Sequence, residues 1–224
     1  MKDIIVNKYP KSAFAEAIKS IKTNLKFSSI NNEIKTILVT SSVAGEGKSF
    51  ITANLAAIYA NSNEKTLIID CDLRRGTQKN IFDLSVSSKN GLSNLLIDKD
   101  WKKKLEKYIN KTKIENLDVM TSGIFPSNPS ALLESKKMND IVEELKSQYS
   151  YIIIDTPPVI GINDAPILSR LADTVIIVSR AKKATVDMLE ETKEILSRVN
   201  VNIAGVVLNR KSKIKNYNNN YYLD

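Results

Sequence analysis

The sequence feature that most constrains the fold is a glycine-bearing loop between an apolar segment and an alanine-rich one. Residues 36–39 (TILV) predict a buried strand, residues 40–49 (TSSVAGEGKS) predict the loop, and residues 50–59 predict a helix. A strand, such a loop and a helix are the context that a phosphate-binding loop requires. Gly45 and Gly47 let backbone N–H groups converge on phosphate oxygens, and the helix start adds free N–H groups and its positive dipole end.

Two side chains after these glycines suit a bound nucleotide. Lys48 can reach the β- and γ-phosphates, and the Ser49 hydroxyl can ligate Mg²⁺. The first position of the common pattern G-x-x-x-x-G-K-[ST] is Ser42 rather than glycine, and a chance Gly-Lys-Ser turn is the alternative interpretation. The flanking strand and helix favour the phosphate-binding loop.

Two further apolar runs end in carboxylates. Residues 64–72 (EKTLIIDCD) predict a buried strand that ends with Asp70 and Asp72. Residues 151–158 (YIIIDTPP) predict another strand, which ends at Asp155 as a Walker B segment does. Ligands of α/β sheets gather at the carboxyl ends of strands, so we expect these side chains near the phosphates. An extended chain would point Asp70 and Asp72 to one side, where Mg²⁺ or Lys48 would offset their repulsion. Solvated aspartates in a turn are the alternative.

The composition excludes several classes of chemistry. With 224 residues, 42% of them hydrophobic, the chain can form one large α/β domain. It has no histidine, which excludes Ser-His-Asp and Cys-His catalysis and disfavours a zinc site. The single cysteine, Cys71, excludes an internal disulfide and is typical of a reducing cytosol. No apolar run reaches transmembrane length, and the first residues do not form a signal peptide.

The formal net charge of +8 would suit nucleic acid, an anionic membrane surface or an acidic protein as a partner. However, the lysines are scattered over several segments instead of being massed with aromatic residues. This distribution favours a solvated basic surface, and we expect no nucleic-acid partner.

The remaining patterns predict a P-loop NTPase fold, with a mostly parallel twisted sheet and helices on both faces. We expect an N-terminal helical segment over residues 1–32, the P-loop domain over residues 33–209, and a disordered, basic, tyrosine-rich tail over residues 210–224. Further helices are expected over residues 11–30, 91–97, 101–110, 131–147, 164–171 and 185–199, and further strands over 117–120, 174–179 and 203–208.

Together, these segments resemble the bacterial tyrosine kinases (BY-kinases) of capsule and exopolysaccharide synthesis, over essentially the whole chain. Residues 42–49 resemble the family's Walker A loop, residues 67–72 its Walker A′ strand, and residues 152–158 its Walker B strand. The segment SGIFPSNPS over residues 122–130 is similar to the family's linker. Tyr217, Tyr221 and Tyr222 resemble its C-terminal tyrosine cluster. The resemblance implies a kinase that uses ATP and Mg²⁺ to transfer the γ-phosphate to tyrosine.

The resemblance also implies roles for single residues. Ser49, Asp72 and Asp155 would hold Mg²⁺, Lys48 would neutralise phosphate charge, and Asp70 would be the candidate base for the tyrosine hydroxyl. ATP would be contacted by the P-loop and by the end of the last strand, namely Ala44, Gly45, Glu46, Gly47, Lys48, Ser49, Phe50 and Asn209.

Assembly and partners follow from the same resemblance. The family carries E-x-x-R-x-x-R between subunits of a ring-shaped homo-oligomer, and this chain has Glu16, Lys19 and Lys22 at those positions. Lysine keeps the charge but lacks the bidentate fork of arginine, and an exposed helix face with ordinary ion pairs is the alternative. The family's shorter members pair with a separate membrane activator protein whose cytosolic tail stimulates them. The chain is similar to that type, so we expect a cytoplasmic kinase recruited to the inner face of the membrane and phosphorylating its own tail between subunits.

Two other functions stay open at this stage. A partition or septum-site ATPase would share the fold, but its relatives place a second lysine five residues before the main one, where this chain has Val43. A non-catalytic, nucleotide-dependent adaptor for polysaccharide machinery is the other alternative. Phosphotyrosine formed with ATP and Mg²⁺ would distinguish the kinase from both.

Overall fold

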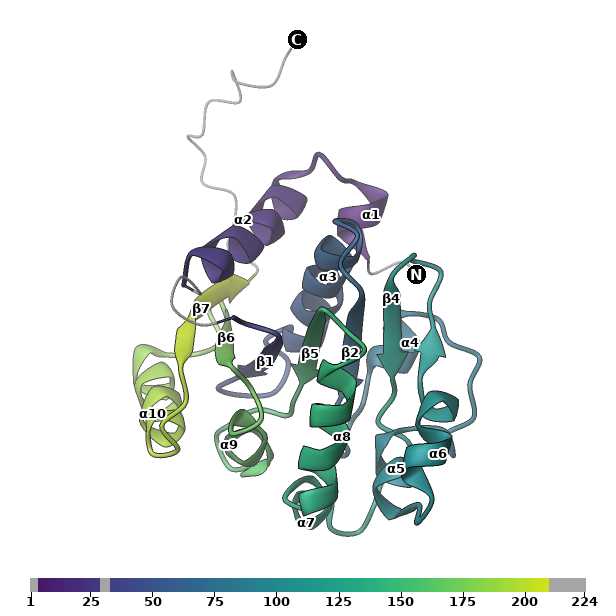
Figure 1. Cartoon of the computed structure of the whole chain (residues 1–224). Coiled ribbons are helices and arrows are strands. Elements are labelled where there is room, and N and C mark those ends of the chain that lie inside the picture. Colours follow the sequence, from purple (N-terminus) through teal and green to yellow (C-terminus); the bar gives the residue numbers. More distant parts are fainter. Residues whose placement is uncertain (1–3, 29–32, 210–224) are drawn as a thin grey trace.

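A seven-stranded sheet in the order β3-β4-β2-β5-β1-β6-β7 runs through the computed structural model (Figure 1). The structure describes residues 4–28 and 33–209, so the tail with its predicted disorder and its three tyrosines lies outside the described residues. All strand pairs are parallel except β3 with β4. The strands are β1 (Thr36–Ser41), β2 (Thr66–Asp70), β3 (Asn110–Lys111), β4 (Leu117–Met120), β5 (Tyr151–Asp155), β6 (Thr174–Arg180) and β7 (Ile203–Asn209).

The central strands form because their residues are almost continuously apolar or β-branched, which suits burial on both faces of a parallel sheet. Every residue of β1, β2 and β4 is buried. Alternate residues face opposite sides: Leu38 belongs to one apolar core, whereas Ile37 and Val39 belong to the other. The two cores lie on opposite faces of the sheet.

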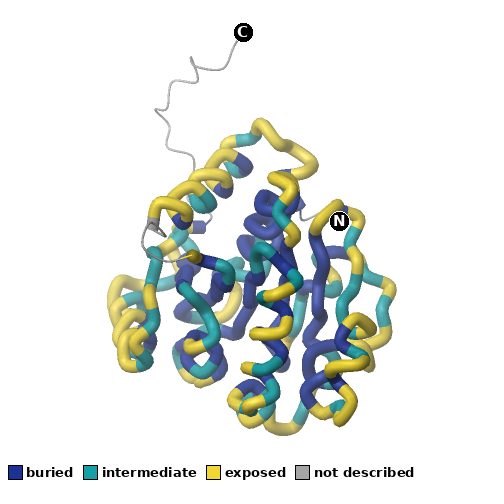
Figure 2. The backbone as a smooth tube through the Cα atoms, viewed as in Figure 1, coloured by how far each residue is buried: buried dark blue, intermediate teal, exposed yellow. Residues whose placement is uncertain are grey.

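Helices cover both cores, as Figures 1 and 2 show, with the buried residues in the sheet and on the inward helix sides. One layer contains α1 (Ile5–Lys8), α2 (Ala13–Ser28), α3 (Lys48–Ala60) and α4 (Gln78–Ile81). The other contains α5 (Leu92–Ile97), α6 (Trp101–Lys104), the 3₁₀ turn η1 (Leu105–Tyr108), α7 (Pro129–Leu133), α8 (Lys136–Lys146), α9 (Asp164–Ser169) and α10 (Val186–Ser197). This arrangement confirms the predicted fold class.

The helix α2 buries Ala15, Ile18 and Leu25 in the same core as α3. Ser12 caps the start of this helix, because its hydroxyl accepts a hydrogen bond from the Ala15 N–H at 3.2 Å. The N-terminal helix is therefore packed against the nucleotide-binding domain by its apolar side.

Two predicted helices were wrong in extent. The expected helix over residues 131–147 is divided into α7 and α8, because the Ser135 hydroxyl caps a new helix by accepting a hydrogen bond from the Met138 N–H. The expected helix over residues 101–110 ends after one turn of α6, tightens into η1, and continues as the edge strand β3. The short helices α1 and α4 were not predicted.

Candidate active site

The P-loop connects β1 to α3 at the carboxyl edge of the sheet. Gly45 and Gly47 have φ angles of 77° and 93°, in the left-handed region that favours glycine. A Cβ at Gly47 would collide with the Asn209 amide, and one at Gly45 would lie 2.7 Å from the Lys183 ammonium. The backbone therefore needs glycine at both positions, and α3 starts directly after the second one, at Lys48.

The side chain of Glu46 is fully buried and holds the shape of this loop. Its carboxylate accepts hydrogen bonds from the Val43 N–H at 2.9 Å and the Arg180 N–H at 3.0 Å. Asn209, at the end of β7, donates to the Glu46 carbonyl at 2.8 Å. Both residues were predicted to contact ATP, and in the structure their side chains contact the loop itself.

Ser42 stands where the common motif has glycine, and the structure shows how its side chain is accommodated. The hydroxyl is buried and accepts a hydrogen bond at 2.9 Å from the Thr192 hydroxyl of α10. Thr192 also donates to the Met188 carbonyl within its helix. Because the Thr192 hydroxyl has one proton, the two acceptors share it, and the departure from the motif is compensated by a polar partner on α10.

A cavity of about 700 Å³ opens in front of the P-loop, a size that suits a nucleotide. Of the eight residues predicted to contact ATP, six line it: Ala44, Gly45, Gly47, Lys48, Ser49 and Phe50. The remaining walls come from the Walker A′ and Walker B regions, through Asp72, Arg74, Arg75, Thr77, Ile81, Pro157, Pro158 and Ile162. The positive side chains of Lys48 and Arg75 suit a polyphosphate.

Asp70 and Asp72 lie in different environments, because β2 ends at Asp70 and the extended geometry stops there. Asp72 lines the cavity, with one carboxylate oxygen 3.4 Å from the Lys48 ammonium and the other accepting from the Arg75 N–H at 2.9 Å. The Asp70 carboxylate is 1% exposed and accepts from the backbone N–H groups of Asp72 at 3.2 Å and Gln78 at 3.0 Å. Burial, and then the nearby Asp155 charge, raise the pKa of Asp70 well above its usual range.

Asp155 is fully buried beside Asp70, because the two residues are register partners on adjacent parallel strands. One carboxylate oxygen accepts from the Gln78 amide at 2.8 Å, whereas the other, Oδ1, has no hydrogen-bond partner among the described residues. Burial raises the pKa of Asp155, and Lys48, Gln78 and the Ser49 hydroxyl oppose that rise.

This donor set fits Mg²⁺. A buried carboxylate oxygen without a partner, next to a serine hydroxyl, is the type of oxygen ligand that Mg²⁺ takes. In residues 4–28 and 33–209 no cluster of three or more His, Cys, Asp or Glu residues could enclose a metal ion. Mg²⁺ at this position would therefore keep water molecules and take ligands from the phosphates of the nucleotide.

The sequence did not single out Gln78, although its fully buried side chain connects three parts of the site. Its amide donates to Asp155 at 2.8 Å and to the Ser49 carbonyl at 3.1 Å, and its N–H donates to Asp70. It lies on the short α4, where one helical turn gives no periodic pattern to recognise.

Arg74, in the loop after the Walker A′ strand, forms an ion pair with a carboxylate of its own chain. Its guanidinium donates to both carboxylate oxygens of the fully buried Asp164, at 2.9 and 3.2 Å, and also to the Ser130 hydroxyl. The hydrogen bonds to Asp164 raise the pKa of Arg74. The pair fixes the Walker A′ loop to α9, and Arg75 lines the cavity beside it.

The predicted subunit-contact residues lie on α2 and do not line this cavity. Lys19 forms a salt bridge with Glu16 at 2.7 Å, and both side chains are about half exposed. Lys22 instead places its ammonium 5.0 Å from the centre of the Tyr59 ring, and burial lowers its pKa. Glu16 and Lys19 thus form an ion pair at the surface, whereas Lys22 makes a cation–π contact with Tyr59.

Comparison with known proteins gives this site its context. The family model described as an AAA domain matches residues 34–207. The chain is 40% identical to CapB of Staphylococcus aureus, named as a tyrosine-protein kinase, and the match covers 98% of this chain and 94% of CapB. The chain belongs to the BY-kinase family. Bacillus subtilis YwqD, another BY-kinase relative, is 34% identical over 99% of this chain and 91% of its own.

Solved structures show the same relationship for this BY-kinase. The chimerical protein CapA2B2 superposes with a TM-score of 0.88 at 38% identity, over 95% of this chain and 92% of the chimera. The septum-site protein MinD of Pyrococcus horikoshii has a TM-score of 0.62 at 22% identity, which shows a shared fold alone. The chain is therefore a tyrosine-protein kinase of the capsule and exopolysaccharide type that uses ATP. Among its described helices, none is long and apolar enough to cross a membrane.

Proposed function

We propose that this BY-kinase uses Mg²⁺ together with ATP to phosphorylate Tyr217, Tyr221 and Tyr222 on a neighbouring copy of itself, and so regulates capsule or exopolysaccharide synthesis and export. The observation that carries the proposal is the unpartnered Oδ1 atom of Asp155, whose carboxylate interacts with Ser49, a residue that lines the cavity in front of the P-loop. Phosphoryl transfer needs chiefly positioning and charge neutralisation, and these residues supply both.

When bound, Mg²⁺ would supply positive charge that neutralises the charge developing on the phosphates. Ser49 and Asp155 would hold the ion, with Asp72 beside them at the cavity wall. Lys48 lies 3.4 Å from Asp72 in this structure, and on nucleotide binding its ammonium would turn to the phosphates. That movement leaves the Asp72 carboxylate free to face the metal site.

Asp70 is the proposed base that orients or deprotonates the acceptor hydroxyl. Its raised pKa means that its anionic form binds a proton more strongly than an ordinary carboxylate does. The carboxylate does not line the cavity in this structure, so a tyrosine hydroxyl would reach it after residues 74–77 shift. The loop contains Gly76, where a Cβ would meet Asp70 Oδ2 at 3.0 Å, so its missing side chain leaves Asp70 thinly covered.

Transfer between subunits is supported by the length of the tail. Residues 210–224 follow β7, whose end at Asn209 touches the P-loop. A flexible segment of roughly ten residues spans on the order of 15–20 Å, which reaches a neighbouring active site in a ring. In the same proposal, Glu16, Lys19 and Lys22 contribute to the subunit contact. Their triple alanine variant should form less of the oligomer seen by light scattering, and an unchanged oligomer would contradict this contact.

A separate membrane protein is the proposed activator, with its cytosolic tail bound to the kinase. This would recruit a cytoplasmic kinase to the inner face of the membrane. Support comes from the likeness to CapB and from the similar chimera CapA2B2, whose name joins CapA to CapB.

The decisive experiment is a phosphotyrosine assay on the full chain with ATP and Mg²⁺, with and without the cytosolic tail of a candidate membrane partner. Phosphotyrosine on the tail supports the proposal, and phosphate release without it would favour the ATPase switch instead. Mixing two inactive chains then tests the route: Lys48→Met with an intact tail, and a chain with the three tail tyrosines changed to Phe. Phosphotyrosine on the Lys48→Met chain indicates transfer between subunits, and its absence while wild type is active indicates transfer within one chain.

A further inference from the structure

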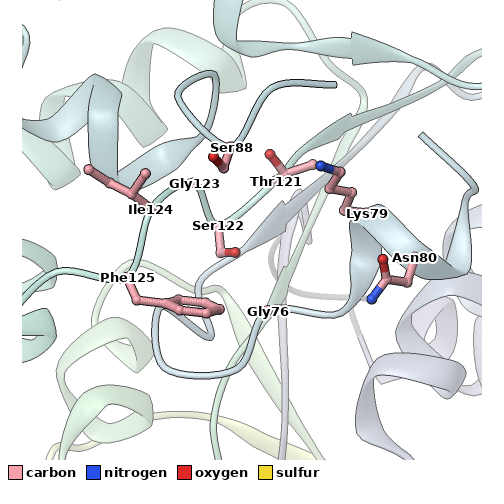
Figure 3. Close-up of a pocket in the computed structure, with 9 residues that line it drawn as sticks. All are labelled: Gly76, Lys79, Asn80, Ser88, Thr121, Ser122, Gly123, Ile124 and Phe125. Carbon is pink, nitrogen blue, oxygen red and sulfur yellow. The ribbon is translucent and has the colours of Figure 1, made fainter. Parts of the chain in front are cut away.

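A second cavity, of about 320 Å³, lies directly beside the nucleotide cavity (Figure 3). The same segment forms part of both walls, because Arg75, Thr77 and Ile81 line the nucleotide cavity whereas Gly76, Lys79 and Asn80 line the second one. The two sites are thus separated by one loop and one turn of helix, and nothing in the mechanism above uses the second.

The walls of the second cavity combine an aromatic ring with hydrogen-bond donors. Figure 3 shows the Phe125 ring below Ser122 and reaching toward Gly76, while the Ser122 hydroxyl points into the space between them and Lys79 extends toward Thr121. Phe125 is 66% exposed, although a ring of this size normally packs against other residues.

The charge of this cavity is positive. Lys79 is half-buried, and within the described part of the chain it takes part in no salt bridge. No carboxylate occurs among the described residues that line the cavity. An ammonium, hydroxyl groups and an amide beside an exposed ring match a ligand that joins an aromatic ring to a compact anion.

We propose that the second cavity binds a phosphotyrosine of the C-terminal tail. A tail already phosphorylated at one tyrosine would then be held beside the active site while another tyrosine is phosphorylated. The phosphate, with about −1.5 to −2 charge at neutral pH, would bind Lys79 and Ser122, and the ring would pack on Phe125. This inference rests on the proposed tail phosphorylation. It adds that the tail tyrosines are phosphorylated one after another, the first helping to hold the tail for the next.

The tail has the spacing that such a site requires. It contains Tyr217, Tyr221 and Tyr222 within eight residues. An extended chain advances about 3.3 Å per residue, so Tyr217 and Tyr221 can lie about 13 Å apart. That distance is enough to cross the loop of residues 74–77 between the two cavities. An unphosphorylated tail is basic through Arg210, Lys211, Lys213 and Lys215, and would gain nothing from Lys79 until the first phosphate is added.

The test measures binding without using kinase activity. The probe is a fluorescent peptide of residues 212–224 that carries phosphate on Tyr221. It is titrated in the absence of ATP with the full chain in which the three tail tyrosines are changed to Phe, and the fluorescence anisotropy of the peptide is recorded. We expect the unphosphorylated peptide to bind at least tenfold more weakly. Lys79→Ala and Phe125→Ala should each weaken the phosphopeptide about tenfold or more, since each removes one part of the recognition. Lys103→Ala, which removes an exposed lysine of α6 outside both cavities, is the matched control.

Competitors separate the possible sources of binding. Phenyl phosphate should displace the peptide at lower concentration than inorganic phosphate, because it also supplies the ring; equal competition would mean a simple anion site and would overturn the proposal. Lys48→Met should leave binding unchanged, and loss of binding there with no effect of Lys79→Ala would place the peptide on the P-loop instead. Equal affinity for both peptides would also refute the inference. If the kinase forms no tail phosphotyrosine, the proposed function fails independently of this binding result.

Discussion

The nucleotide cavity and the second cavity share a wall but differ in the charges that line them. The first contains Asp72 opposite Lys48, with the buried carboxylates of Asp70 and Asp155 behind it. The second contains Lys79 and hydroxyl groups without a carboxylate among its described lining residues. A site with both signs of charge can hold a metal ion with phosphates, whereas a site whose charged lining group is an ammonium suits the anion without a metal ion. The difference indicates two separate tasks for one short segment of the chain.

The largest effect that separates the cavities is expected from Lys48→Met. This variant should lower phosphotyrosine formation by roughly a hundredfold or more, because a positive charge at the transferred phosphate is lost. Its circular dichroism spectrum should match wild type, since methionine keeps most of the volume of the largely buried Lys48 side chain. Retained activity, or loss of folding, would contradict the role assigned to Lys48.

The carboxylates behind the nucleotide cavity should separate into metal-binding and chemical roles. Asp155→Asn should raise the Mg²⁺ concentration needed for half-maximal activity by about tenfold or more, and Asp72→Asn should do so as well. Asp70→Asn should mainly lower kcat. Asp118→Asn is the control, because Asp118 is also a buried carboxylate but pairs with Lys111 and Tyr149 away from the cavity. If Asp70→Asn changes only the Mg²⁺ requirement, the roles of Asp70 and Asp72 are exchanged.

Gly76→Ala tests the wall that the two cavities share. A Cβ here would collide with the Ser122 hydroxyl and approach Asp70 Oδ2 at 3.0 Å, so both neighbours must move. We expect a several-fold loss of both phosphopeptide binding and kinase turnover, with the KM for ATP little changed. If Gly76→Ala affects only one of the two readouts, the cavities are not coupled through this loop.

The smallest expected effect is a difference between wild type and Asp70→Asn in how the melting temperature depends on pH. A carboxyl whose folded pKa is raised, as that of Asp70 is, keeps its proton in the folded chain at pH values where the unfolded chain has lost it. The free energy of unfolding therefore falls as pH rises above the unfolded value of about 4, until the folded pKa is passed. Melting temperatures of the Mg²⁺-free chain between about pH 4 and pH 8 should decline less steeply for Asp70→Asn, by a few degrees. Parallel declines would contradict the raised pKa of Asp70.

The fold was predictable because long apolar strands and one P-loop carry strong local signals. The strand β5 ends at Asp155 as the sequence pattern predicts, whereas β2 ends at Asp70, before the predicted end at Asp72, and the two strands pair in parallel. The break at Ser135 was missed because the same serine can cap a helix or sit within one, and only the packing of α7 and α8 decides between them. Local sequence therefore gives the elements but not every boundary.

The site was predictable only where chemistry depends on residues close together in the chain. The P-loop residues were identified from one contiguous motif, and six of them line the cavity. The contact of Gln78 with Asp155 joins residues that are 77 positions apart in the sequence. The pairing of Arg74 with Asp164 joins residues that are 90 positions apart. The second cavity is also formed by separate segments, around Lys79 and around Phe125. No single-sequence pattern encodes such distant contacts.

The hydrogen bond between Ser42 and Thr192 has a consequence for how this sequence can change. A glycine at position 42 alone would leave the Thr192 hydroxyl with only its own helix as a partner, and an apolar residue at position 192 alone would leave the buried Ser42 hydroxyl unsatisfied. We therefore expect an apolar residue at position 192 to lower the free energy of unfolding less when position 42 is glycine, so the two positions should change together. In chains that restore the glycine, we expect the residue at the position of Thr192 to lose its hydroxyl as well.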